Sequence, residues 1–274
     1  MMLCRCIFLA LVSSAFVLEN VALGASDLPL VFFHGATMTF EAGNNFEANL
    51  TAEAAQWRRC RSVAAPEAVR EVVANNSAFD DGYIFIGHSQ GGLIARGVIE
   101  EMDDYKVKRF ISLAGLQNAA TVFNYGPEDY YGKMQKDFVL YSVENPGVQG
   151  LHSHFNCVYD QHCRKSNFLK VEQAHFFASS ADTVIKPWQN SLFGRYSEVD
   201  TIEEIQTKFM NLTMVDMKDT IEYTSDTFGL RTMDERGGLF LREIANVTHL
   251  CWVLDEGNCE WVTVYDQHIY PALV

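Results

Sequence analysis

The sequence predicts an α/β fold, with a mostly parallel central sheet and helices on both of its faces. Short continuous apolar runs alternate with amphipathic segments, and this alternation is typical of strand–helix–strand units in a parallel sheet. The chain has 274 residues, of which 48% are hydrophobic, and this is enough to bury one sizeable core. We therefore expect one domain carrying an insertion rather than two separate domains.

The elements of the first half follow from these patterns in order. The apolar run Leu28 to Phe33 opens at Pro29 and closes at His34-Gly35, as expected of a strand buried on both faces of a parallel sheet. The elements then expected in chain order are helices over 46–57 and 66–75, a strand over 83–86, a helix over 91–102 and a strand over 109–113.

The second half begins with a segment in which this alternation breaks up. From about 117 to 167, Tyr, Asn, His, Gly and Pro are scattered among short apolar pieces, and we interpret this segment as an inserted cap. The sheet resumes with a strand over 174–178. A helix over 201–212 and a final loop bearing His249 complete the expected organisation.

The N-terminus predicts a secretory signal peptide over residues 1–24, which leaves a mature domain over 25–274. Arg5 precedes the apolar run Ile7 to Val17, and small residues at Ala22 and Gly24 form a cleavage pattern. The apolar run is shorter than the roughly 20 residues of a membrane-spanning helix. We therefore expect a soluble protein of the secretory pathway without a transmembrane anchor, located in the lysosome or outside the cell.

The cysteines and the glycosylation motifs agree with export. The spacing predicts the disulfides Cys157–Cys163 and Cys251–Cys259 and leaves Cys60 without a partner. No zinc-type spacing accompanies these cysteines, so neither a metal nor a cofactor is expected. Acceptor motifs of the Asn-x-Ser/Thr type begin at Asn49, Asn75, Asn211 and Asn246.

The charge of the chain excludes one class of partner. The formal net charge is −14 and the sequence pI is about 4.9, so the surface repels nucleic acid. We expect a monomer that binds no nucleic acid.

The strongest local signal is the pentapeptide Gly87-His88-Ser89-Gln90-Gly91, between an expected strand and an expected helix. A G-x-S-x-G sequence in this setting is typical of the nucleophile elbow of an α/β-hydrolase, where small flanking residues permit a tight turn and expose the serine. We therefore expect Ser89 to be a nucleophile. The backbone N–H groups of Gln90 and of Ala36, after the first strand, are the expected oxyanion donors.

A serine nucleophile needs a base and an orienting acid, which follow it in the order Ser, Asp, His in this fold. Asp182 follows the strand expected over 174–178, and His249 lies just before the Cys251–Cys259 loop. These two residues are the expected acid and base. The other histidines considered as bases are His88, His152, His154, His162, His175 and His268.

Longer strings carry a resemblance to a known family. Residues 28–35, 87–93 and 185–194, together with 223–229, resemble the palmitoyl-protein thioesterase family. The resemblance implies hydrolysis of long-chain fatty acyl thioesters, with S-acylated proteins or acyl-CoA as substrates, in the lysosome. It implies the triad Ser89, Asp182 and His249, with the oxyanion donors Ala36 and Gln90.

One feature departs from the family pattern. Family members have a further apolar strand before the nucleophile elbow, whereas residues 56–62 here run almost directly into the helix that begins at Pro66. The sequence therefore predicts that one core strand is missing, and Cys60 is left in the same region.

A long acyl chain requires an apolar groove. Aromatic and apolar residues of the cap either line this groove or only join the cap to the sheet. They are Phe123, Tyr125, Tyr130, Tyr131, Phe138, Leu140 and Phe155. Trp188, beyond the cap, is a further expected groove residue. Two other functions stay open: an oxygen-ester lipase or esterase with the same triad, and a non-catalytic lipid-binding relative.

Overall fold

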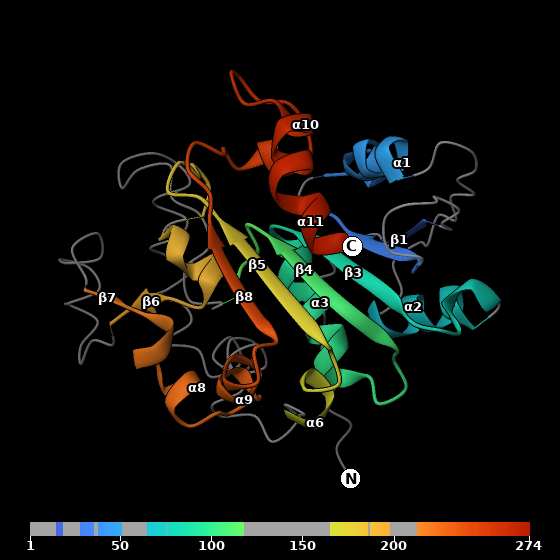
Figure 1. The fold of residues 1–274 in the computed structure, drawn as a ribbon, viewed down its shortest axis with the longest axis horizontal. Helices are drawn as coiled ribbons and strands as arrows, with labels where there is room; N and C mark the ends of the chain where they lie inside the picture. Colours follow the sequence, from blue (N-terminus) through green and yellow to red (C-terminus); the bar gives the residue numbers. More distant parts are fainter. Residues whose placement is uncertain are drawn as a thin grey trace, which may run out of the picture.

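A computed structural model describes residues 15–18, 28–35, 38–50, 65–74, 76–117, 165–185, 187–197 and 213–274. Its centre is a six-stranded sheet (Figure 1), ordered β1 (Ala15–Leu18), β2 (Leu30–Phe33), β3 (Tyr83–His88), β4 (Val107–Leu113), β5 (Gln173–Ala178) and β8 (Leu239–Glu243). The strands from β2 to β8 are parallel, and β1 pairs antiparallel with β2. The predicted α/β class with a mostly parallel sheet is confirmed.

Helices cover both faces of the sheet, because alternate strand residues point to opposite sides. Phe33, Phe85 and Phe176 belong to one core, together with residues of α2 (Ala65–Val73), α3 (Gln90–Glu101), α6 (Lys165–Phe168) and α9 (Leu230–Glu235). Phe32 and Ile86 belong to the other core, together with residues of α1 (Asn44–Leu50), η6 (Leu250–Trp252), α10 (Trp261–Val264), η7 (Tyr265–Ile269) and α11 (Tyr270–Leu273). Neighbouring residues of one strand therefore serve two separate cores.

The remaining described elements are short. They are η1 (Phe40–Gly43), η2 (Ser77–Phe79), η3 (Trp188–Leu192), η5 (Met217–Asp219), α8 (Ile221–Thr224) and a two-stranded sheet of β6 (Arg195–Tyr196) and β7 (Met214–Val215). None of the helices in the described ranges has the length and apolar character that crossing a bilayer would require.

The structure corrects the prediction in the C-terminal third. Only a helix over 201–212 and a loop were expected there; residues 201–212 lie outside the described ranges, and the structure adds the strand β8 before His249. Because β8 lies at the edge of the sheet, its residues alternate between half-buried and exposed after Leu239. The strand therefore lacks the continuous apolar run that marks a central parallel strand.

The prediction of a missing strand between β2 and β3 stays a prediction, because residues 56–62, on which it rests, lie outside the described residues. In the described parts of this region, 38–50, 65–74 and 76–82, the chain forms helices and turns and no strand. The outer edge of β2 is instead paired by β1, with Ala15 opposite Phe33 and Leu18 opposite Leu30. Since β1 lies within the predicted signal peptide, cleavage after Gly24 would remove this pairing and open the edge of β2.

The residues on either side of 118–164, the main part of the predicted cap, are attached to the core. The carbonyl of buried Gln117 accepts a hydrogen bond from Arg96 Nη1 at 2.7 Å, and Arg96 forms a buried ion pair with Glu100 at 3.2 Å. At the other end, Lys165 forms an ion pair with buried Asp226. Both ends of this segment are thus held by contacts with charged side chains that lie beside the central sheet.

Candidate active site

Ser89 lies in a tight turn between the C-terminal end of β3 and the first residue of α3. Its backbone has φ 55° and ψ −125°, a strained conformation for a residue with a side chain. The turn brings backbones very close together: a Cβ added at Gly87 would lie 2.5 Å from the carbonyl oxygen of Gly91, and one added at Gly91 would lie 2.1 Å from that of Phe33. Both flanking positions therefore require glycine, and the turn has the geometry of a nucleophile elbow.

Asp182 and His249 form a buried hydrogen-bonded pair. His249 Nδ1 lies 2.8 Å from Asp182 Oδ2, and both side chains are almost fully buried. The other oxygen of the carboxylate, Oδ1, accepts from the backbone N–H groups of Val184 and Ile185, each at 2.8 Å. A carboxylate only accepts hydrogen bonds, so Nδ1 of His249 is protonated and Nε2 of the neutral ring carries the lone pair.

The loops after β3, β5 and β8 meet at this pair. His88, the residue before Ser89, lies 2.9 Å from the carbonyl oxygen of His249 through its Nε2. Ser179 Oγ, in the loop that carries Asp182, accepts from the N–H of Val247 at 3.2 Å. Sequence reasoning weighed His88 only as a competing base and missed both contacts, although a histidine beside the nucleophile was a signal that could have raised the first.

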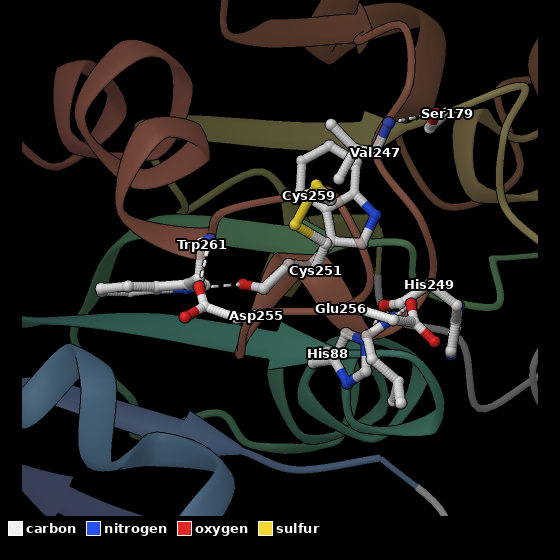
Figure 2. Close-up of a disulfide and its surroundings, with 11 residues drawn as sticks. His88, Ser179, Val247, His249, Cys251, Asp255, Glu256, Cys259 and Trp261 are labelled. Atoms are coloured by element: carbon white, nitrogen blue, oxygen red, sulfur yellow. Dashed lines mark hydrogen bonds between the residues drawn. A yellow bond between two sulfur atoms is a disulfide. The ribbon is translucent and has the colours of Figure 1, made fainter.

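A disulfide closes the chain just after His249, as Figure 2 shows. Cys251 and Cys259 are bonded, as their spacing predicts. The loop that they enclose is tied back to the histidine, because Glu256 Oε2 accepts from the N–H of Leu250 at 3.2 Å. Cys157, Cys163 and Cys60 lie outside the described residues.

The expected oxyanion donors can be placed only in part. Gln90 is the first residue of the 12-residue helix α3. Its backbone N–H is therefore one of the four at the start of the helix that have no hydrogen-bond acceptor within the helix. The positive end of the helix dipole also lies there. Ala36 lies outside the described residues and stays a prediction.

The other expected site residues fall into two groups. Trp188 is half-buried at the start of η3, beyond the Asp182 loop. The other expected groove residues, among them Phe123, Tyr130, Phe138 and Phe155, all lie outside the described residues. Of the acceptor motifs, Asn49 and Asn246 are exposed, while Asn75 and Asn211 also lie outside them.

A carboxylate partner separates His249 from two of the rival histidines, His88 and His175. Burial lowers the pKa of His88 to about 3, with a smaller contribution from His249, and burial with nearby Arg242 lowers the pKa of His175 to about 3. Both are therefore neutral over the range in which a histidine base works. Neither has a carboxylate at hydrogen-bond distance among the described residues, whereas His249 has Asp182.

Curated relatives match most of the chain. It is 30% identical over 201 residues to lysosomal thioesterase PPT2-B of Xenopus laevis, covering 62% of this chain and 64% of the relative. It is 27% identical over 224 residues to lysosomal thioesterase PPT2 of Homo sapiens, covering 70% of this chain and 66% of the relative. The chain thus spans slightly less than two thirds of these relatives' own length.

Solved structures with a similar fold are more distant. An esterase, RhEst1 from Rhodococcus sp., covers 96% of this chain and 96% of its own with a TM-score of 0.48 and 10% identity. A monoacylglycerol lipase of Paleococcus ferrophilus covers 89% of this chain and 93% of its own with a TM-score of 0.42 and 11% identity. Similarity this low bears on neither activity nor substrate.

The family model decides the assignment. The model of palmitoyl protein thioesterase matches residues 29–149 and 150–249, and this range holds the Ser89 elbow together with Asp182 and His249. The chain belongs to the palmitoyl protein thioesterase family.

Proposed function

We propose that this protein hydrolyses long-chain fatty acyl thioesters, either palmitoyl groups on protein cysteines or acyl-CoA, with Ser89, Asp182 and His249 as the catalytic triad. The observation that carries the proposal is the buried 2.8 Å contact between His249 and Asp182 beside the Ser89 elbow. The names of the curated relatives, lysosomal thioesterases, support the thioester as the reactive group. They also support a location in the lysosome or elsewhere along the secretory pathway.

In the proposed reaction, Ser89 Oγ attacks the acyl carbonyl while His249 Nε2 takes the hydroxyl proton. Asp182 holds the tautomer that leaves Nε2 free and stabilises the imidazolium that forms. The backbone N–H groups of Gln90 and Ala36 donate to the oxyanion, each donor lowering the barrier by about 3 kcal/mol. The tetrahedral intermediate collapses, and the leaving sulfur, whose thiol has a pKa near 8.5, takes the proton back from the His249 imidazolium. Neutral His249 then accepts a proton from water, which attacks the acyl group on Ser89, and returns that proton to Ser89 Oγ as the fatty acid is released.

The test is release of CoA from palmitoyl-CoA by purified protein, with Ser89→Ala beside it. The matched control is Ser225→Ala, because Ser225 is an exposed serine at the end of α8. We expect Ser89→Ala to remove the enzymatic rate and Ser225→Ala to keep it. Equal rates for the wild type and Ser89→Ala would refute the proposal.

Two further measurements separate the open alternatives. Palmitoyl thioesters and oxygen esters assayed side by side distinguish a thioesterase from a lipase or esterase, since both use the same triad. A fluorophosphonate probe, which labels an activated serine only, tests for a non-catalytic lipid binder. We expect labelling of the wild type and none of Ser89→Ala.

A further inference from the structure

His88 contributes nothing to the triad chemistry described above, yet its side chain is fully buried beside the base. Its Nε2 lies 2.9 Å from the carbonyl oxygen of His249, and the centroids of the two rings are 4.8 Å apart. Figure 2 shows the two residues side by side beneath the disulfide. Since a carbonyl only accepts, Nε2 of His88 must donate, and this sets the tautomer of His88.

The other ring nitrogen of His88 points toward the loop after β2. A Cβ added at Gly35 would lie 3.3 Å from His88 Nδ1 and 3.0 Å from Ser89 Cβ. Nδ1 has no hydrogen-bond partner among the described residues. Burial lowers the pKa of His88 and so keeps its ring neutral. A neutral ring has a single N–H, and this N–H donates to the His249 carbonyl.

The constraints on His249 divide between its ring and its main chain. Asp182 holds the ring through Nδ1, and rotation about the side-chain bonds is restricted in this way. The main chain of His249 and that of Ser89 belong to different parts of the sheet. The His249 loop follows β8, whereas Ser89 follows β3. The bond from His88 joins these two strand ends directly, at the residue next to the nucleophile.

We propose that His88 is a positioning residue for the hydrolysis: its Nε2–H bond to the His249 carbonyl sets the distance between the base and Ser89. The inference rests on the proposed function. It predicts that the hydrogen bond, rather than the aromatic ring, is required. Loss of the bond lets the His249 loop move relative to the elbow, and a displacement of about 1 Å in a catalytic group costs about 100-fold in rate.

The test compares His88→Gln with His88→Phe on palmitoyl-CoA. The amide nitrogen of glutamine reaches about as far as Nε2 and can donate to the same carbonyl, whereas phenylalanine keeps the ring shape without a donor. We expect His88→Phe to lower kcat by about 10- to 100-fold with little change in KM, and His88→Gln to recover most of that loss. A His88→Phe variant with wild-type kcat, or two folded variants that lose the same rate, would overturn the proposal.

A second measurement does not depend on folding of a variant. The ¹⁵N and ¹H shifts of histidine side chains in the wild-type protein report the tautomer of each ring. We expect His88 to remain the Nε2–H tautomer and not to titrate at mildly acidic pH. A His88 that titrates with a normal pKa, or that carries its proton on Nδ1, would refute the inference, whereas a wild type without Ser89-dependent activity would refute the proposed function itself.

Discussion

The buried histidines predict how the stability of the fold depends on pH. The pKa values of His88 and His175 are lowered from 6.5 to about 3 in the folded protein. The unfolded chain therefore binds protons that the folded chain excludes. Stability is complete above the unfolded pKa of 6.5 and falls as the pH drops from there toward about 3.

The size of this effect follows from linkage. A histidine with these two pKa values lowers the free energy of unfolding by about 2 kcal/mol between about pH 7 and about pH 5. At about pH 5 this change in the free energy of unfolding depends little on the pKa in the folded protein, because a histidine with so low a pKa is unprotonated there at this pH. Removing either imidazole should therefore reduce the pH dependence of stability by about 2 kcal/mol.

Urea unfolding of the wild type, His88→Gln and His175→Gln at about pH 7 and about pH 5 tests this expectation. His268→Gln is the control, because His268 is half-buried, whereas His88 and His175 are buried. The absolute stability of a variant does not enter, since only the difference between the two pH values is compared. If both variants kept the wild-type pH dependence, the conclusion that these rings are neutral in the folded protein would be wrong.

Three further predictions concern the elbow, the histidine loop and the exported form. We expect Gly91→Ala to yield little folded protein, because its Cβ would lie 2.1 Å from a carbonyl oxygen. Gly237→Ala has open space around its Cβ and only the strain of a φ of +76°, so it should lose about 1–2 kcal/mol in a thermal melt; equal yields would contradict this. Cys251→Ser should lower the free energy of unfolding by about 2.5 kcal/mol and also lower kcat, and an unchanged kcat would show that the disulfide does not hold His249. Asn246→Gln in protein secreted from eukaryotic cells should remove one endoglycosidase-sensitive mass step, and an unchanged mass would exclude this site.

Much of the fold could be predicted because its central strands are buried on both faces. The runs at Leu30–Phe33 and Tyr83–His88 are apolar almost throughout, and such runs are typical of strands inside a parallel sheet. The edge strands could not be predicted in this way. β8 has one exposed row of side chains, and β1 lies in a segment whose composition is typical of a signal peptide.

The candidate site divides similarly. Ser89, Asp182 and His249 could be selected from the sequence because a nucleophile elbow constrains its own residues and the order of the other two. The structure brings Asp182 and His249 into contact. The contact of His88 with the His249 carbonyl was missed, since it joins a side chain to the backbone of a residue 161 positions away; the place of His88 beside the nucleophile indicated a position near the base but not this partner.

The attachment of Gln117 and Lys165 has a consequence for how this fold can diversify. Each end of the segment 118–164 is anchored by its own charged contact, Arg96 at one end and Asp226 at the other. The anchors belong to α3 and to the loop before α9, so they stay in place whatever lies between them. In a chimera, residues 118–164 are exchanged for the corresponding segment of a relative. Such a chimera should therefore acquire a new substrate preference while keeping the rate of fluorophosphonate labelling at Ser89.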